Sequence, residues 1–297
     1  MERKSVLITG CSPGGIGHAI AREFHDQGLH VIATARNPSV LADLAELGLS
    51  TLQLDVTNSD SLKACHEAVA KLTAGKLDIL VNNAGRTHVQ PAIDVDLDDL
   101  RQTFETNVFG VMATVKTFAD QLMAARGLVI NIASASAVAP YVFGAPYAAS
   151  KGAVVSYSRA LRLELEPYGV RVMVAMTGTV RSQIASRHFR DLPPGSVYEP
   201  ARHIFEWRFT FSQKTATMDT AEYARGLVAA ALRPEVPRFL RTWFGRPDWL
   251  WTGGMSRILW LGHSIGEWFV DFVCYRMFRM KELQGLLQQE SATKKLK

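Results

Sequence analysis

The sequence predicts an α/β protein with one parallel, doubly wound sheet and helices on both of its faces. Short apolar runs alternate with longer stretches of helical periodicity as far as Arg181, and a glycine-rich loop separates the first run from the first helical stretch. The 297 residues, 47% of them hydrophobic, are enough for a large buried core. Repeated strand–helix–strand units of this kind form parallel sheets.

The expected elements follow the chain in order. Strands are expected at residues 6–9, 31–35, 51–54, 79–81, 129–132 and 172–176, and helices at residues 17–27, 61–73, 97–123 and 148–166. Beyond Arg181 the alternation stops, and residues 186–218, which hold three prolines, read as a long loop insertion of the kind that covers active sites. We therefore expect a catalytic domain over residues 1–240, with a substrate-loop insertion at residues 183–220, and an amphipathic helical extension over residues 241–297.

Charge and cysteine content argue against several kinds of protein. The net charge of +5 is small for this length and no block of lysine and arginine occurs, so a nucleic-acid binder is not expected. The cysteines, Cys11, Cys65 and Cys274, are far apart and form no CxxC pair, which argues against disulfides and against a metal site. The apolar run at residues 6–8 is too short for a signal peptide, so we expect an intracellular protein.

The glycine-rich loop lies where a dinucleotide-binding loop is required, between the first strand and the first helix. Glycines let the backbone approach a pyrophosphate, and the helix N-terminus offers free N–H groups to it. An ordinary glycine-rich turn is the alternative, and the position in the chain favours the cofactor. The candidate cofactor-binding residues are Gly10, Ser12, Gly15, Ile16 and Gly17.

The residue after the second strand indicates which nicotinamide cofactor is preferred. A cofactor without a 2′-phosphate is usually held there by an acid, but residues 31–40 contain none. Arg36 offers a guanidinium for the 2′-phosphate instead, so we expect NADP(H), the alternative being a solvated surface arginine. Asp55, at the end of the third strand, is either an adenine contact or a turn residue.

A candidate catalytic set lies on two further elements. Tyr147 and Lys151 are four residues apart, so they share one face of a helix. A neighbouring ammonium favours the phenolate, which makes Tyr147 a candidate general acid in reduction and base in oxidation. Ser134 follows the strand at residues 129–132, with Ser136 close by, and Asn107 lies inside a long helix, where asparagine can open the hydrogen-bond ladder. Taken singly, each of these residues also has an ordinary structural role.

Together these motifs resemble the classical short-chain dehydrogenase/reductase family over residues 5–182. The resemblance implies a Rossmann-type fold and a tetrad in which Asn107 holds a water, Ser134 binds the carbonyl oxygen, Tyr147 donates the proton and Lys151 binds the nicotinamide ribose. It also implies homo-oligomers and four further cofactor contacts, at Asn83, Lys116, Val180 and Ser182. Two departures concern the cofactor: the glycine loop is one residue longer than usual, so Gly14 or Gly15 fills its middle position, and Thr177-Gly178 stands where the family has Pro-Gly.

A narrower resemblance concerns the substrate. The GGIG form of the loop, residues 192–198 and Tyr223-Ala224 are similar to the 1-acyldihydroxyacetone-phosphate reductase-like branch, whose relatives also occur in secondary metabolism. The expected reaction interconverts a ketone or aldehyde and an alcohol on a hydrophobic substrate, either a secondary metabolite or an acyl-dihydroxyacetone phosphate. A non-catalytic NADPH-sensing module is the alternative of another class. Basic residues of the insertion would suit a phosphate or form a solvated face, namely Arg187, His188, Arg190, Arg202, His203 and Arg208.

Residues 253–278 read as an amphipathic helix without an uncharged run of the ~20 residues that cross a bilayer. Such a helix suits the surface of an endomembrane or lipid droplet, and packing of its apolar face on the core, the substrate pocket or a second subunit is equally open. Its polar side would hold Arg257, Ser264, Glu267 and Asp271, and its apolar side Ile258, Leu261, Ile265, Trp268, Phe269 and Phe272.

Overall fold

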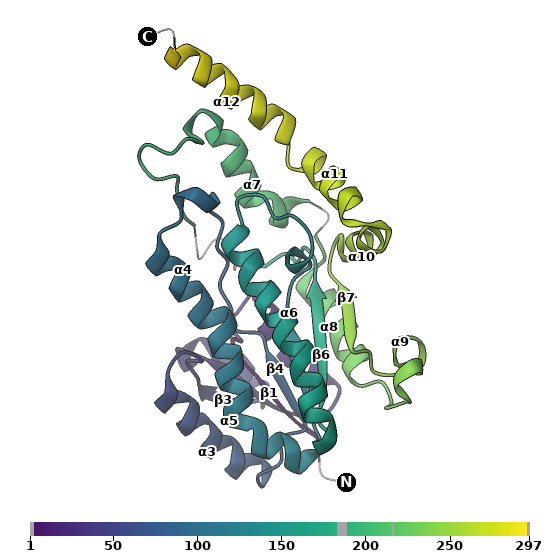
Figure 1. The fold of residues 1–297 in the computed structure, drawn as a ribbon. Helices are drawn as coiled ribbons and strands as arrows, with labels where there is room; N and C mark the ends of the chain where they lie inside the picture. Colours follow the sequence, from purple (N-terminus) through teal and green to yellow (C-terminus); the bar gives the residue numbers. More distant parts are fainter. Residues whose placement is uncertain (1–2, 183–188, 216, 296–297) are drawn as a thin grey trace.

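The computed structural model describes residues 3–182, 189–215 and 217–295, and within these ranges seven parallel strands form one twisted sheet (Figure 1). The strand order is β3-β2-β1-β4-β5-β6-β7. The four central strands, β1, β4, β5 and β6, are buried on both faces. They correspond to continuous apolar runs of the sequence, as expected for the centre of a parallel sheet. The strands are β1 (Ser5–Ile8), β2 (His30–Ala35), β3 (Ser50–Gln53), β4 (Ile79–Asn82), β5 (Leu128–Ile132), β6 (Arg171–Thr177) and β7 (Trp249–Thr252).

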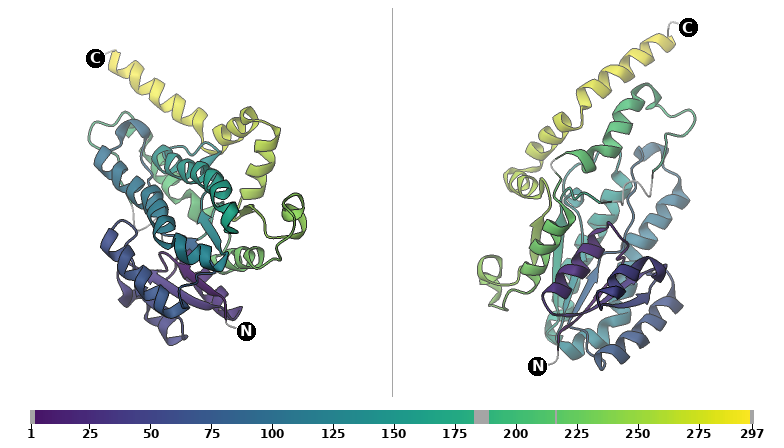
Figure 2. Two further views of the ribbon diagram at one scale, coloured as in Figure 1. Left: turned by 60° about the horizontal axis from the view of Figure 1, so that its bottom comes forward. Right: turned by 180° about the vertical axis from the view of Figure 1, so that it is seen from behind.

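Helices cover both faces of this sheet, which confirms the expected α/β class (Figures 1 and 2). One face carries α1 (Ile16–Asp26), α2 (Ala42–Glu46) and α8 (Thr220–Ala231). The other carries α3 (Ser59–Thr73), α4 (Leu97–Phe104), α5 (Gly110–Ala125) and α6 (Ala145–Leu165). Over the carboxyl ends of the strands lie α7 (Arg202–Lys214), α10 (Ser256–Ile265), α11 (Glu267–Met277) and α12 (Met280–Lys295), and α9 (Arg241–Phe244) lies to the side of β7.

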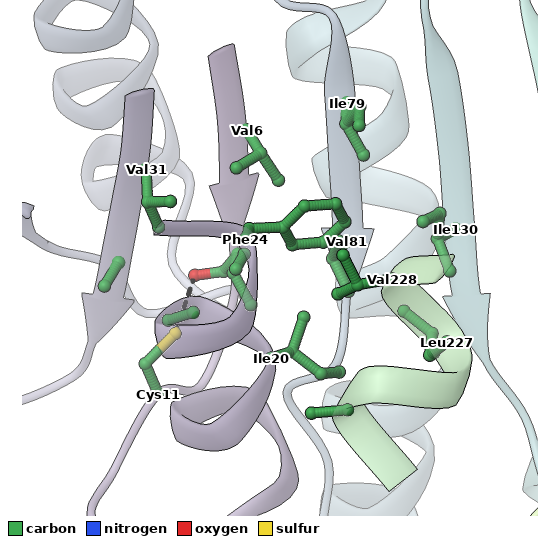
Figure 3. Close-up of a cluster of buried hydrophobic side chains, with 14 of the residues drawn as sticks. Val6, Cys11, Ile20, Phe24, Val31, Ile79, Val81, Ile130, Leu227 and Val228 are labelled. Atoms are coloured by element: carbon green, nitrogen blue, oxygen red, sulfur yellow. Dashed lines mark hydrogen bonds between the residues drawn. The ribbon is translucent and has the colours of Figure 1, made fainter. Parts of the chain in front are cut away.

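The core between the sheet and the α1–α8 pair shows how these layers hold together (Figure 3). Phe24 of α1 lies against Val6 and Val81 of the sheet and close to Val228 of α8, and all four side chains are fully buried. Cys11 is buried in the same layer, and its thiol donates to the carbonyl of Ile8 at 3.3 Å. The described cysteines are all free and buried, so Cys11 packs as a small apolar side chain.

Three sequence expectations were wrong beyond Arg181. The strand–helix alternation does not stop there, because α8 and β7 add one more unit and β7 pairs with β6. The sheet therefore extends past residue 240, and its last strand lies in the segment expected to be an extension. The insertion is not a plain loop either: α7 buries Ile204, Phe205, Arg208 and Phe211 on one helical face, and the part of the insertion at residues 183–188 lies outside the described residues.

The expected single helix over residues 253–278 is two helices, α10 and α11, because the chain bends at Gly266, whose φ of +145° suits glycine. The apolar side predicted for this segment is mostly exposed: Ile258, Leu261, Ile265, Trp268 and Phe272 are each more than half accessible. Packing of this face on the core is thereby excluded for these five side chains. No helix in the described ranges is both long and apolar enough to span a bilayer.

Replacing Phe24 with alanine should lower the free energy of unfolding by about 3–5 kcal/mol, because a fully buried ring between sheet and helices leaves a cavity. Denaturant unfolding measures this change. Leu72→Ala on α3, at a side chain that is 42% exposed, is the control and should change the stability by no more than about 0.5 kcal/mol. Equal effects of the two changes would contradict the role of this core.

Candidate active site

A cavity of about 510 Å³ lies over the carboxyl ends of the central strands. It begins at the loop after β1, passes the ends of β2, β4 and β5, and ends among aromatic side chains of α7 and α11. The sheet order reverses between β1 and β4, and crevices at such a switch point are where open α/β sheets bind ligands. Twelve of the expected site residues line it: Gly10, Ser12, Gly15, Ile16, Arg36, Asp55, Asn83, Ser134, Tyr147, Lys151, Val180 and Ser182.

The loop after β1 has the backbone geometry of a phosphate cradle. Gly10 has a φ of +76°, and a Cβ there would lie 2.9 Å from the Cα of Ala84. Gly15, rather than Gly14, lines the cavity, and a Cβ on it would lie 2.9 Å from the carbonyl oxygen of Ser12. Among the described residues no side chain caps the N-terminus of α1, so its first N–H groups are available to an anion.

Asn83 locks this loop to the end of β4. Its side-chain amide donates to the carbonyls of Thr9 and Gly10, each at 2.9 Å, and the hydroxyl of Thr9 accepts from the N–H groups of Asn83 and Ala84. Gly17 does not line the cavity but packs beneath it, since a Cβ there would lie 2.3 Å from the amide nitrogen of Asn83. Thr9 is a site-forming residue that the sequence analysis did not single out.

Arg36 and Asp55 stand at the ends of β2 and β3. Arg36 is exposed, borders the cavity and forms no ion pair with any residue in the described ranges, so its guanidinium is available to a ligand. Asp55 borders the cavity too, and one of its carboxylate oxygens accepts from the N–H and the hydroxyl of Thr57 at 3.0 and 2.7 Å. Asp55 is thus a turn residue whose other oxygen is not used by this turn.

Tyr147 and Lys151 project from the same face of α6 into the middle of the cavity. The Lys151 Nζ lies 5.8 Å from the centre of the Tyr147 ring and donates to the carbonyl of Ile132 at 2.8 Å. Ser134, just beyond β5, lines the cavity close to Tyr147, and its hydroxyl favours the phenolate form. The hydroxyl of Ser136 donates to that of Ser134 at 2.9 Å, which leaves the Ser134 proton free to be donated onward.

The surroundings change the pKa of both titratable groups in opposite directions. Desolvation by the surrounding protein raises the pKa of Tyr147 above its usual value, the nearby Tyr141 raises it further, and the polar Ser134 hydroxyl opposes these effects. Burial lowers the pKa of Lys151 to about 8. At neutral pH the phenol therefore holds its proton, and the lysine is mostly protonated but close to its titration point.

Asn107 lies behind this group, in a π-helical turn (Glu105–Phe109) between α4 and α5. The N–H of Gly110 donates to the carbonyl of Glu105 five residues earlier, so the helical ladder is widened here, as the asparagine suggested. The Asn107 side chain is buried, accepts from the N–H of Arg86 at 2.8 Å and donates to the Ser150 hydroxyl at 3.0 Å. Asn107 thus holds in place the segment after β4 that contains Arg86. Arg86 lines the cavity, whereas Asn107 does not.

The structure does not bring Lys116 to the cavity. Lys116 is exposed on α5, whereas its neighbours Val115 and Phe118 turn into the core, so the expected cofactor contact at Lys116 was wrong.

The Thr177-Gly178 departure has a structural basis: Thr177 hydrogen-bonds to the buried Tyr223 hydroxyl at 2.7 Å. A Cβ on Gly178 would lie 2.0 Å from the carbonyl of Gly254, so the chain after β6 packs too closely for a larger residue.

The far end of the cavity is apolar and comes from segments distant in the sequence. Its lining residues belong to the loop after β5 and to the helices α7, α10 and α11, and they include Tyr141, Phe211, Leu259, Cys274, Met277 and Phe278. None of them follows a motif, so the sequence analysis missed them. A hydrophobic substrate would lie here, next to Tyr147, because Tyr141 and Tyr147 are in ring contact at 5.8 Å.

Comparison with known proteins agrees with this geometry. A family model described as short chain dehydrogenase matches residues 4–193. The chain is 39% identical to an NADPH-dependent 1-acyldihydroxyacetone phosphate reductase of Schizosaccharomyces pombe, over 85% of this chain and 86% of that one. It is 37% identical to the short-chain dehydrogenase srdE of Neurospora crassa, over 94% of each chain. A short-chain dehydrogenase structure from Streptomyces avermitilis superposes with a TM-score of 0.73 and 26% identity, over 96% of this chain and 98% of that one. The chain belongs to the short-chain dehydrogenase family and is an oxidoreductase.

Proposed function

We propose that this enzyme uses NADP(H) to interconvert a ketone or aldehyde and the corresponding alcohol on a hydrophobic substrate. One observation carries the proposal: the phenol of Tyr147, the ammonium of Lys151 and the hydroxyl of Ser134 open on the same cavity as the glycine loop after β1. A non-catalytic NADPH sensor would need the loop but not the Tyr147 phenol and the Ser134 hydroxyl in the same cavity. The arrangement therefore favours an enzyme.

In reduction, the substrate carbonyl oxygen would accept hydrogen bonds from Tyr147 and Ser134. The bound cofactor supplies the hydride that the carbonyl carbon receives, and the Tyr147 proton passes to the carbonyl oxygen as the charge develops there. The phenol carries this proton at neutral pH, and burial, which raises its pKa, makes the phenolate costly unless a charge stabilises it. The Lys151 ammonium stabilises the phenolate that remains, and its pKa of about 8 allows it to return a proton at neutral pH.

The residues at the other end of the cavity fit a phosphorylated dinucleotide. The N-terminus of α1 and the loop from Gly10 to Ile16 would hold the pyrophosphate, and Arg36 would bind the 2′-phosphate. Asn83, Val180 and Ser182 would contact the nicotinamide half, and the free oxygen of Asp55 would accept from the adenine amino group. The S. pombe relative is named as NADPH-dependent, which supports the same cofactor.

The substrate remains a choice between two hydrophobic classes. The S. pombe relative is named for an acylated dihydroxyacetone phosphate, whereas the N. crassa relative is named only as a short-chain dehydrogenase. We infer that the apolar end of the cavity takes either a lipid of the first kind or a secondary-metabolite ketone. The catalytic unit would span the sheet and its helices through β7, with α10 to α12 as the helical C-terminal extension.

We further propose that the enzyme contacts a membrane surface through α10 and α11. Their outer face exposes Trp260, Trp268 and several aliphatic and aromatic side chains, and their inner face contributes Leu259 and Met277 to the cavity. Tryptophans together with aliphatic side chains on short exposed helices are typical of membrane interfaces. A hydrophobic substrate could then pass from the lipid into the cavity between these helices. The alternative is that the same face forms the contact between subunits of a homo-oligomer.

Replacing Tyr147 with phenylalanine should lower turnover of a carbonyl substrate by about 100-fold or more, because the proton donor is lost. NADPH affinity should stay within about twofold of the wild-type value, since only one hydroxyl at the reacting end of the cavity is removed. Such a change is well below a tenfold change in affinity, which corresponds to about 1.4 kcal/mol. NADPH oxidation and calorimetric titration of NADPH measure the two quantities. Tyr157→Phe on the same helix is the control and should retain activity. Undiminished turnover by Y147F would contradict the assigned proton donor.

Replacing Arg36 with alanine should reduce the preference for NADPH over NADH by about tenfold or more, because a charge-assisted hydrogen bond to the 2′-phosphate is lost. The ratio of kcat/KM for the two cofactors measures this preference. Arg22→Ala removes an exposed cation from α1 without touching the cavity and should leave the ratio unchanged. A preference for NADPH that survives R36A would contradict the assignment.

The double change Trp260→Ser and Trp268→Ser should weaken binding to anionic phospholipid vesicles by about tenfold or more, because two interfacial indoles are removed. Vesicle co-sedimentation measures the binding. The control is Leu163→Ser with Tyr168→Ser, which removes two exposed apolar side chains at the opposite end of the sheet. Conversion of a lipid-free dimer to a monomer by the tryptophan changes would instead identify this face as a subunit contact.

A further inference from the structure

The basic residues of the insertion differ sharply in what surrounds them. Arg187 and His188 lie outside the described residues. Three of the others pair with carboxylates and face solvent or the loop after β4: Arg190 with Asp99, Arg202 with Glu199 and Asp191, and His203 with Glu282. Arg208 differs from all of these, since no acidic side chain in the described ranges lies within ion-pair distance of it.

Arg208 is also the largest fully buried side chain of the described part, with 1% of its surface accessible. Its Nε and Nη2 have no hydrogen-bond partner among the residues that the structure describes. A buried cation without a counter-charge or acceptor is costly, so such groups in proteins are nearly always paired. The neighbouring Cys274 does not supply the charge, because burial raises the pKa of its thiol to about 11 and keeps it neutral.

Three aromatic rings surround the guanidinium. Its Cζ lies 3.9 Å from the centre of the Tyr141 ring, 4.7 Å from that of Phe278 and 5.6 Å from that of Phe211. Ring faces attract a cation and offset part of the cost of burying it, but they provide no hydrogen-bond acceptor. All three rings line the apolar end of the cavity, whereas Arg208 does not line it itself, so the guanidinium packs against side chains of the wall that would face the substrate.

We propose that Arg208 is a specificity residue that binds an oxyanion, a phosphate or a carboxylate, carried by the carbonyl substrate. The inference rests on the proposed function, because it places this anion in the substrate end of the same cavity. Tyr141 contacts both Arg208 and Tyr147, so turning its ring aside brings the anion to the guanidinium while the carbonyl stays at the phenol. The substrate would thus carry its anionic group only a few bonds from the reacting carbonyl and its apolar part elsewhere in the cavity.

The test uses unreactive amphiphiles of one chain length, so it does not depend on turnover. The enzyme is saturated with NADPH, which occupies the cofactor's own phosphate sites, and is titrated by calorimetry with octyl phosphate, octanoate and 1-octanol. We expect octyl phosphate, octanoate or both to bind about tenfold or more tightly than 1-octanol, as for a hydrogen-bonded charge pair. Whether the phosphate, the carboxylate or both are preferred identifies the oxyanion.

Variants assign the preference to Arg208. Arg208→Met should abolish it while 1-octanol still binds, and Arg208→Lys should retain part of it because the charge is kept without the guanidinium fork. Arg202→Met removes a cation from the same helix that is already paired, and it should leave the preference intact. Wild-type protein that binds all three amphiphiles equally overturns the proposal even if R208M does not fold. An equal loss of octyl phosphate and 1-octanol binding in R208M also overturns it, since Arg208 would then only hold the rings in place.

Failure of this inference can be told apart from failure of the proposed function. Absence of NADPH binding in a calorimetric titration with NADPH alone, made before any amphiphile is added, would contradict the proposed function itself. Normal NADPH binding together with equal binding of the three amphiphiles would contradict only the oxyanion site. The enzyme would then be a reductase of neutral hydrophobic carbonyl compounds.

Discussion

The parallel arrangement of the strands is the constraint on which the site depends. Because every strand of the sheet runs in the same direction, the loops that follow β1, β2, β4 and β5 must all emerge at one edge. Residues separated by more than a hundred positions thereby meet in one cavity: the glycine loop near residue 10, Arg36, Ser134 and the α6 pair. A register error in any central strand would separate these groups, so the burial of β1, β4, β5 and β6 on both faces protects the chemistry as well as the fold.

Within the cavity, burial shifts the pKa values of the two groups to which we assign proton exchange, Tyr147 and Lys151. Desolvation makes Tyr147 a weaker acid and Lys151 a weaker base than in water, so their two pKa values, which are usually nearly equal, move in opposite directions. The Ile132 carbonyl holds the Lys151 ammonium in place, so its charge is fixed beside the phenol before any substrate arrives. In the proposed mechanism, the proton donor and the charge that stabilises its phenolate are thus held in place before the reaction.

The sequence predicted the part of the molecule that local signals encode. Six strands, the glycine loop and the tetrad residues follow from apolar runs, glycines and the i, i+4 spacing of Tyr147 and Lys151, which are properties of neighbouring positions. The π-helical turn at Asn107 was also foreseeable, because asparagine is unfavourable inside a helix. The family resemblance, which the comparisons confirm, extends these motifs to a mechanism.

The rest depends on contacts between distant segments. β7 is a short, half-exposed aromatic strand, and it pairs with β6 only because α8 returns the chain to that edge. The sequence analysis therefore placed this segment in the C-terminal extension. Lys116 stands on a helix at the expected place in the chain but on its exposed side, which spacing alone does not reveal. Arg208 was indistinguishable in the sequence from the solvated cations around it. Its burial arises because α7 brings it against Tyr141 from the loop after β5 and Phe278 from the end of α11.

The helices over the cavity give one physical account of the substrate. Their inner side is apolar and, through Arg208, carries a positive charge for which the described part of the chain offers no carboxylate, whereas their outer side exposes tryptophans and aliphatic side chains. A neutral, compact ketone would use the apolar wall but leave the buried charge unpaired, and a small charged ketone would pair the charge but leave the wall empty. A molecule with both an oxyanion near its carbonyl and an apolar chain satisfies the two demands together, and it is also the kind of molecule that resides at a lipid surface. The buried arginine and the exposed tryptophans, on opposite sides of the same layer, are therefore explained by a single amphiphilic substrate.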